Sequence, residues 1–262
     1  MPSTYGKNRK PRGHVRPRSV TQRTKGLYAA WLFNESAGLR IRDHSGHRRD
    51  IVSSGTAFSW VNAPWGPAIY AGSADDLDTG MNIADDLDEF TMSFRVTTET
   101  LGGSRYIIDQ SVGSTGFALR MDPALDQFHF FYYSGGGGVG GNHPTVLVTN
   151  TWYHVIIRAS AAASDIWVDG SKTSVGVGTV DTAVDTANLI GDYAQGGNDW
   201  LGGLDHAFVW DHAKTDREVL DLFVDPYAMF KGPEFVDYVP ALAAGPGGIT
   251  PALYYQLMAG AV

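Results

Sequence analysis

Acidic side chains gather between residues 74 and 89, in the segment ADDLDTGMNIADDLDE, where the pentapeptide Ala-Asp-Asp-Leu-Asp occurs twice at an interval of ten residues. Clustered carboxylates are ligands that Ca²⁺ prefers, but this spacing differs from the alternating ligands of an EF-hand loop. Two solvated acidic turns explain the pattern more simply. We therefore expect no cofactor; the alternative is calcium, held by candidates among Asp75, Asp76, Asp78, Asp85, Asp86 and Asp88.

Groups suited to hydrolysis are present, but their spacing does not indicate a catalytic site. Retaining glycoside hydrolysis needs two carboxyl groups about 5–5.5 Å apart, which alternate positions of one strand can supply. No two of the glutamates share a strand at that spacing; they are Glu35, Glu89, Glu99, Glu218 and Glu234. The motifs Gly-x-Ser-x-Gly and His-Glu-x-x-His are absent, and so is cysteine, which excludes thiolate nucleophiles, cysteine-bound zinc and disulfides. We expect no catalytic residue.

Histidines and glycines that could imitate a functional motif have simpler interpretations. We interpret the histidines as structural or surface residues, including His44, His47, His154 and His206. The run GGGGVGG at residues 135–141 lacks the Gly-Lys-Ser/Thr of a phosphate loop and precedes Asn-His-Pro instead of a helix. We interpret that run as a flexible loop between strands.

Aromatic side chains are the residues best suited to stack on a sugar ring. Trp60, Trp65 and Trp200 lie in or near segments rich in Gly, Pro and Asn, and Tyr132 and Tyr133 are further candidates. The alternative is packing, because a loop tryptophan often fills the space beneath its own loop. Four other tryptophans have the pattern of core residues: Trp31, Trp152, Trp167 and Trp210. Aromatic content alone does not define a groove, so glycan contact is a hypothesis for these positions.

Charge is divided unevenly along the chain. Residues 1–25 hold eight basic residues and no acid, a formal charge of +8, whereas residues 26–262 hold 12 basic and 28 acidic residues, 12 − 28 = −16. The first segment has too few apolar residues to fold alone, so we interpret it as an extended attachment arm. Such an arm suits an acidic protein surface or a phosphate backbone, so nucleic acid is allowed but not required. Its basic residues are Lys7, Arg9, Lys10, Arg12, Arg16, Arg18, Arg23 and Lys25.

Short alternating segments predict an all-β protein. In Phe90–Val96 apolar and polar residues alternate almost without exception, and similar patterns predict strands at 27–33, 104–109, 116–121, 127–133, 152–159, 165–168, 187–191 and 203–210. Asp169-Gly170 is a favoured hairpin turn, and Thr215 with Glu218 has the spacing of a capping box that opens one short helix. So many strands with so little helix favour two packed antiparallel sheets.

The order of these segments resembles the concanavalin A-like lectin/glucanase jelly roll, in its laminin G-like branch. The resemblance covers about residues 26–230 and rests on AAWLFNES (29–36), DHSGHRRD (43–50), FTMSFRV (90–96), TWYHVIIR (151–158), IWVDG (166–170) and LGGLDHAFVWDHAKTDREVLDLF (201–223). It implies a two-sheet jelly roll. Glucanases of the family carry a Glu-x-Asp-x-x-Glu strand, which is missing here. Asp43 and Asp205 align with polar positions of the family pattern, where we expect them to bond turn amides.

These observations predict three parts: a basic arm (1–25), a jelly-roll domain (26–230) and a Pro/Gly-rich tail (231–262). The tail is expected to dock through an apolar segment that contains Leu253, Tyr254, Tyr255, Leu257 and Met258. VDPYAMFKGP at 224–233 is similar to the sequence that follows such domains in bacteriophage structural proteins. We therefore expect a non-enzymatic decoration protein of a bacteriophage virion, without a secretion signal or membrane span, that is bound to capsid or other virion proteins. It is expected to be a homo-oligomer, by analogy a trimer. The alternative is a carbohydrate-binding module, with or without calcium, that has no virion role and contacts surface glycans.

Overall fold

The structure is a computed structural model that describes residues 25–53, 58–72, 77–183, 186–190 and 198–231. All of these belong to one compact unit, and a second unit, residues 233–262, lies wholly outside the described residues. Of the predicted basic arm only Lys25 is described, and it is exposed. The apolar residues predicted for tail docking lie outside the described residues, and so do Glu234, Asp75 and Asp76. No helix in the described part is long and apolar enough to cross a membrane.

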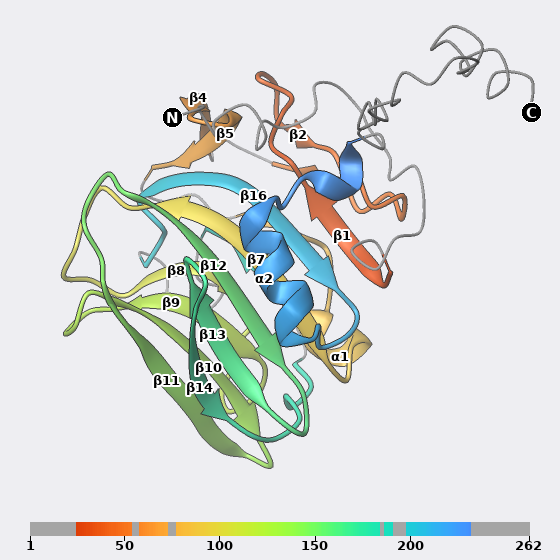
Figure 1. Cartoon of the computed structure of the whole chain (residues 1–262), viewed down its shortest axis with the longest axis vertical. Coiled ribbons are helices and arrows are strands. Elements are labelled where there is room, and N and C mark those ends of the chain that lie inside the picture. The colour runs from red at the N-terminus through yellow and green to blue at the C-terminus, as the bar shows by residue number, and fades with distance from the viewer. Residues whose placement is uncertain (1–24, 54–57, 73–76, 184–185, 191–197, 232–262) are drawn as a thin grey trace, which may run out of the picture. The chain divides into compact units, whose positions relative to one another are not determined.

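Two antiparallel sheets form the body of the unit, as the strand patterns predicted. The larger sheet has the order β14-β13-β12-β7-β16-β5-β4, and β1 also pairs with β16. Its strands are β1 (Leu27–Trp31), β4 (Phe58–Ala63), β5 (Gly66–Ala71), β7 (Phe90–Thr97), β12 (Trp152–Ala159), β13 (Ser164–Val168), β14 (Ser171–Gly176) and β16 (Gly202–Trp210). Figure 1 shows helix α2 (Asp216–Val224) lying across this sheet.

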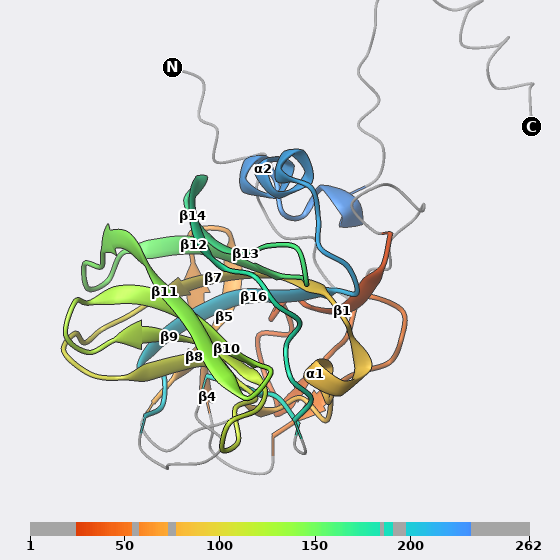
Figure 2. The ribbon, with the colours of Figure 1, turned by 90° about the horizontal axis from the view of Figure 1, so that it is seen from below.

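The smaller sheet has six strands in the order β11-β10-β9-β8-β15-β6. They are β6 (Leu77–Asp78), β8 (Arg105–Asp109), β9 (Phe117–Asp122), β10 (Gln127–Ser134), β11 (Gly137–Val146) and β15 (Asn188–Leu189). The remaining elements are the hairpin strands β2 (Arg40–Ile41) and β3 (Ile51–Val52), helix α1 (Ile83–Asp86) and a 3₁₀ turn at Ala228–Phe230. Figure 2 shows the sheets as two layers, with α2 on the outer side of the larger one.

The main core lies between the sheets and confirms the predicted alternation. Phe90, Met92, Phe94 and Val96 of β7 are fully buried there, opposite the fully buried inward residues of the smaller sheet. Those residues are Phe117, Leu119, Met121, Phe128, Phe130 and Tyr132. Because the side-chain period of a strand is two, each strand presents its other residues to the opposite face. On β7 that face is also buried, since helix α2 and the segment after it cover the larger sheet.

The helix cap and the hairpin turn predicted from the sequence both form in the structure. Thr215 and Glu218 form the predicted capping box at the start of α2. Asp169 and Gly170 both have positive φ, 48° and 90°, as a type I′ hairpin turn requires. The glycine run is the exception. Gly137–Val146 forms strand β11, so the interpretation of residues 135–141 as a flexible loop was wrong beyond the turn at Gly135 and Gly136.

Two histidines that are far apart in the sequence meet beneath α2. Ser93 Oγ lies 2.8 Å from His154 Nε2 and 3.0 Å from His206 Nε2, and all three residues are buried. Burial, together with the nearby charges of Arg95 and His206, lowers the pKa of His154 well below its usual value of 6.5. His154 is therefore neutral in the folded protein at neutral pH.

Acid should destabilise the protein through His154. In the unfolded chain His154 takes up a proton near pH 6.5, whereas in the folded chain it does not. The free energy of unfolding is therefore unaffected by His154 above pH 6.5 and decreases as the pH falls below that value. The loss is about 1.4 kcal/mol per pH unit until the folded-state pKa is reached. Urea unfolding at pH 7 and pH 5 measures it. In the His154→Gln variant the free energy of unfolding should differ less between pH 7 and pH 5. A difference equal to that of the wild type would contradict the assignment of the acid sensitivity to His154.

Candidate functional site

Strand β10 carries aromatic residues on both of its faces. Its even-numbered residues point into the core, and Tyr132 is fully buried, so the hypothesis that Tyr132 contacts a sugar was wrong. The odd-numbered residues His129, Phe131 and Tyr133 are partly exposed on the outer side of the six-stranded sheet. The centroids of the Phe131 and Tyr133 rings are 6.2 Å apart, and those of His129 and Phe131 are 5.8 Å apart. The three rings therefore form a continuous row.

Small residues flank this row. Phe131 lies between Ala118 of β9 and Gly140 of β11, and Tyr133 pairs with Gly138 of β11. Because directly opposite residues on neighbouring strands share a face, these alanine and glycine residues are the direct cross-strand neighbours of the two rings. A Cβ at Gly140 would lie only 2.9 Å from both Phe131 Cβ and His129 Nε2, so glycine at this position of β11 gives these two side chains their space.

A polar row crosses the sheet beside the rings. Tyr106 of β8, Arg120 of β9, His129 of β10 and Asn142 of β11 are successive cross-strand partners. Arg120 Nη1 donates to Tyr106 Oη at 3.2 Å, and His129 Nδ1 is hydrogen-bonded to Asn142 Oδ1. We call these four residues, with Phe131 and Tyr133, the aromatic face. It combines apolar ring surfaces with fixed hydrogen-bonding groups, which is how small-ligand sites achieve affinity and orientation.

Arg120 is the positive charge of the aromatic face. Its guanidinium carbon lies 5.1 Å from the centroid of the Phe131 ring and 5.7 Å from that of Tyr106. Burial lowers the pKa of His129 despite its hydrogen bond to Asn142, and Arg120 adds to the effect. The imidazole of His129 is therefore neutral at pH 7.

The tryptophans proposed from the sequence lie elsewhere. Trp200 is fully buried, donates Nε1 to the Thr97 carbonyl oxygen at 3.0 Å and stacks on Phe128, so its assignment as a glycan contact was wrong. Trp65 is partly buried, with the Arg95 guanidinium 3.8 Å from its ring centroid. Trp60 is partly buried and donates Nε1 to the Gly38 carbonyl oxygen at 3.0 Å. Glycan contact stays a prediction for Trp60 and Trp65.

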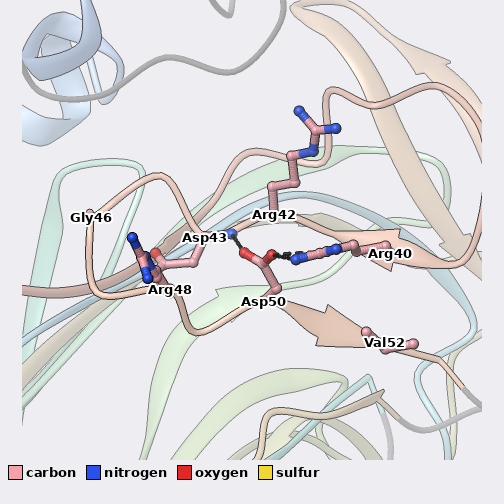
Figure 3. Close-up of a pocket in the computed structure, with 7 residues that line it drawn as sticks. All are labelled: Arg40, Arg42, Asp43, Gly46, Arg48, Asp50 and Val52. Carbon is pink, nitrogen blue, oxygen red and sulfur yellow. Dashed lines mark hydrogen bonds and ion pairs between the residues drawn. The ribbon is translucent and has the colours of Figure 1, made fainter.

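A separate cavity of about 550 Å³ lies at the β2–β3 loop, lined by Arg40, Arg42, Asp43, Gly46, Arg48, Asp50 and Val52. Asp43 accepts hydrogen bonds from the amides of Ala30, Ser45 and Arg49, which confirms its predicted role in turns. Asp50 is paired with Arg40 and also accepts the Asp43 amide, as Figure 3 shows. Both carboxylates are thus engaged in holding the loop.

Asp205 differs from its sequence-based expectation. It is fully buried in β16, accepts a hydrogen bond from Tyr227 Oη and lies 3.6 Å from Arg95 Nη1. The expectation that it bonds turn amides was wrong, because β16 runs through the middle of the larger sheet, where a carboxylate needs a buried partner.

Within the described residues, the acidic candidates for calcium and the glutamates do not gather into one site. Among the described residues no group of three or more His, Asp or Glu side chains could hold a metal ion. Asp78 and Asp86 accept bonds from Thr186 Oγ1 and Tyr28 Oη, and Asp85 accepts one from Asn82; Asp88 is exposed. The four described glutamates lie outside the strands, Glu218 within α2, so no two share a strand.

Comparisons with known proteins agree with the observed architecture. The model of the family described as the concanavalin A-like lectin/glucanases superfamily matches residues 71–220. No curated protein sequence matches the chain. Among solved structures, a Trypanosoma rangeli sialidase is 14% identical with a TM-score of 0.58, over 84% of this chain and 37% of the sialidase chain. The chain thus spans just over a third of the length of that enzyme.

Two other similar structures are binding domains or parts of larger enzymes. The binding domain of Paraclostridial Mosquitocidal Protein 1 is 14% identical with a TM-score of 0.61, over 77% of this chain and 52% of that one. Domain 4 of AbnA, an extracellular arabinanase from Geobacillus stearothermophilus solved with arabinotriose, is 16% identical with a TM-score of 0.60, over 75% of this chain and 97% of that domain. At these identities the likeness concerns the fold alone.

Proposed function

The chain belongs to the concanavalin A-like lectin/glucanase superfamily, and on that basis we propose that it is a non-catalytic domain that binds a glycan on its aromatic face. The observation that carries the proposal is the pair of partly exposed rings, Phe131 and Tyr133, opposite Ala118, Gly140 and Gly138. Partly exposed aromatic rings offer the apolar surface that the carbon side of a sugar ring needs.

The polar row gives such a ligand an orientation. The hydrogen bond between His129 and Asn142 fixes two polar side chains beside the rings, and Arg120 offers a charged donor. A similar fold in complex with an oligosaccharide, the arabinanase domain with arabinotriose, supports a glycan as the ligand class. The missing carboxylate pair supports binding without hydrolysis, so incubation with the bound glycan should release no reducing ends.

Substituting Gly138 should block the face without unfolding the protein. A Cβ at Gly138 would lie 3.9 Å from Tyr133 Cε1, an ordinary contact, with no other atom as close. Valine suits a strand, so Gly138→Val should fold normally and cover the Tyr133 ring. We expect at least about tenfold weaker binding, which is a loss of about 1.4 kcal/mol. A glycan array identifies the ligand, and calorimetry measures the affinity.

The neighbouring glycine provides a matched control. Gly137 is also exposed on β11, and a Cβ there would meet only the Ser134 carbonyl oxygen at 3.6 Å. Because successive side chains of a strand point to opposite faces, Gly137→Val should leave binding unchanged. If the wild-type chain bound no glycan on the array, with or without added Ca²⁺, the proposed function would be wrong.

We further propose that this domain is displayed on a bacteriophage virion and attached through its terminal segments to capsid or other virion proteins, as a homo-oligomer. The support is the contrast between the +8 charge of residues 1–25 and the −16 charge of residues 26–262, together with the segment VDPYAMFKGP. Opposite charges on adjoining copies favour such contacts. Light scattering of the full chain and co-sedimentation with particles test the proposal. A monomer that stays in the supernatant would contradict it.

A further inference from the structure

We propose that the glycan bound by the aromatic face is acidic and that Arg120 receives a carboxylate of one of its sugar units. This inference rests on the proposed function and specifies its ligand class. It follows from the surroundings of one side chain in the middle of the face.

Arg120 is held in place but incompletely paired. Its flanking cross-strand partners are Tyr106 and His129, and its guanidinium lies near the rings of Tyr106 and Phe131. One hydrogen bond, from Nη1 to Tyr106 Oη, fixes its direction. Its Nε is buried and has no hydrogen-bond partner within the described part of the chain. A buried donor of a charged group that lacks a partner is unfavourable, so the guanidinium gains more than an exposed one would from a new charged partner at its outer nitrogens.

The acids on the same face contact groups other than Arg120, and Asp122 Oδ2 lies 3.9 Å from His129 Nδ1. Asp122 accepts the amides of Ala124 and Leu125, and its other oxygen lies 3.4 Å from Asn142 Nδ2. Asp109 accepts the amide and the hydroxyl of Ser111. No described acidic residue forms an ion pair with Arg120.

The neighbouring groups select the ligand chemistry. A planar guanidinium matches a carboxylate through two parallel hydrogen bonds, and such charge-assisted bonds are stronger than neutral ones. The Phe131 ring beside it can stack on the sugar that carries the carboxylate. A uronic acid unit has both a ring to stack and a carboxylate to pair, whereas a neutral hexose has only the ring.

The test compares each acidic glycan with the same glycan after its charge is removed. Polygalacturonate, alginate and hyaluronate are presented to the full chain beside their methyl esters. We expect at least one acid to bind about tenfold more tightly than its ester. Arg120→Met keeps the apolar stem that packs on Phe131 but removes the charge, and it should reduce the difference to less than about twofold. Arg120→Gln, also uncharged but able to donate to Tyr106, is the second variant if the methionine variant does not fold.

A remote arginine controls for overall charge. Arg217 lies on α2, with its side chain 85% exposed, so Arg217→Met removes the same charge from another surface and should leave the preference intact. If the esters bind as tightly as the acids, or if both Arg120 variants keep the preference, the inference is overturned while the proposed function stands. If the wild-type chain binds neither these polymers nor any neutral glycan of the array, the proposed function fails as well.

Discussion

A chain with Phe131→Ala and Tyr133→Ala together should lose measurable glycan binding and remain folded. Truncating an aromatic residue at the centre of a binding surface typically costs about 2 kcal/mol or more. Two such losses, about 4 kcal/mol, weaken binding about 1,000-fold. Both side chains lie on the outer face of the sheet, while the core residues of β10 are unchanged. Calorimetry with the glycan found on the array measures the loss, and far-ultraviolet circular dichroism checks the fold.

Trp60→Ala is the matched control, because Trp60 is another partly exposed aromatic residue of the same domain. It lies on β4 of the other sheet and packs edge-on against Phe58 at 5.4 Å. If the glycan binds on the aromatic face, this variant should bind like the wild type, whereas glycan contact at Trp60 predicts weaker binding. If Trp60→Ala abolished binding and the double variant did not, the glycan site would lie at the Trp60 loops, and the aromatic face would be a packing feature.

Replacing Arg158 with methionine should destabilise the protein by about 3–5 kcal/mol, because it leaves a buried carboxylate without its main partner. Arg158 on β12 pairs with Asp165 on β13, which is 1% exposed, and also lies 2.8 Å from Asp216 at the start of α2. It further donates to the Lys214 carbonyl oxygen. One side chain thus joins two strands to the helix that covers them. Urea denaturation at pH 7 measures the change.

Lys172→Met tests whether the stability comes from the buried Arg158–Asp165 pair or from the more exposed charges around it. Lys172 Nζ lies 3.5 Å from Asp165 Oδ2 and 3.0 Å from Asp216 Oδ2, but its side chain is 37% exposed. Exposed ion pairs contribute about 0–1 kcal/mol, so this variant should lose less than about 1 kcal/mol. Equal losses in the two variants would show that burial of Asp165 is not the cause.

Local patterns predicted most of the fold. Strict alternation in Phe90–Val96 marked β7, and the capping box at Thr215 and Glu218 marked the start of α2. These signals are strong because a strand period of two and a helix cap each depend on residues that are close in sequence. The family resemblance predicted from these segments is confirmed over residues 71–220.

The candidate site was predicted only in part. Tyr133 was named from the sequence together with Tyr132, but only Tyr133 lies on the outer face. Trp200 was named for its polar neighbours, yet the core encloses it. No local signal distinguishes these positions, because exposure depends on which layer covers each face. The sequence carried no signal that marked Arg120 and Phe131 as site residues, although both lie within segments predicted as strands.

By itself, the amino-acid sequence determined which residues share a face of each strand, where the helix begins and how charge is divided along the chain. The tertiary structure decided which face points outward, which strands are neighbours and what each glycine adjoins. Pairing between β9, β10 and β11 places Arg120, Phe131 and Gly140 on one surface, and a shift of register by one residue would move every side chain of a strand to the other face. Register is set by contacts between distant segments, so the binding face emerges only when the sheets are packed.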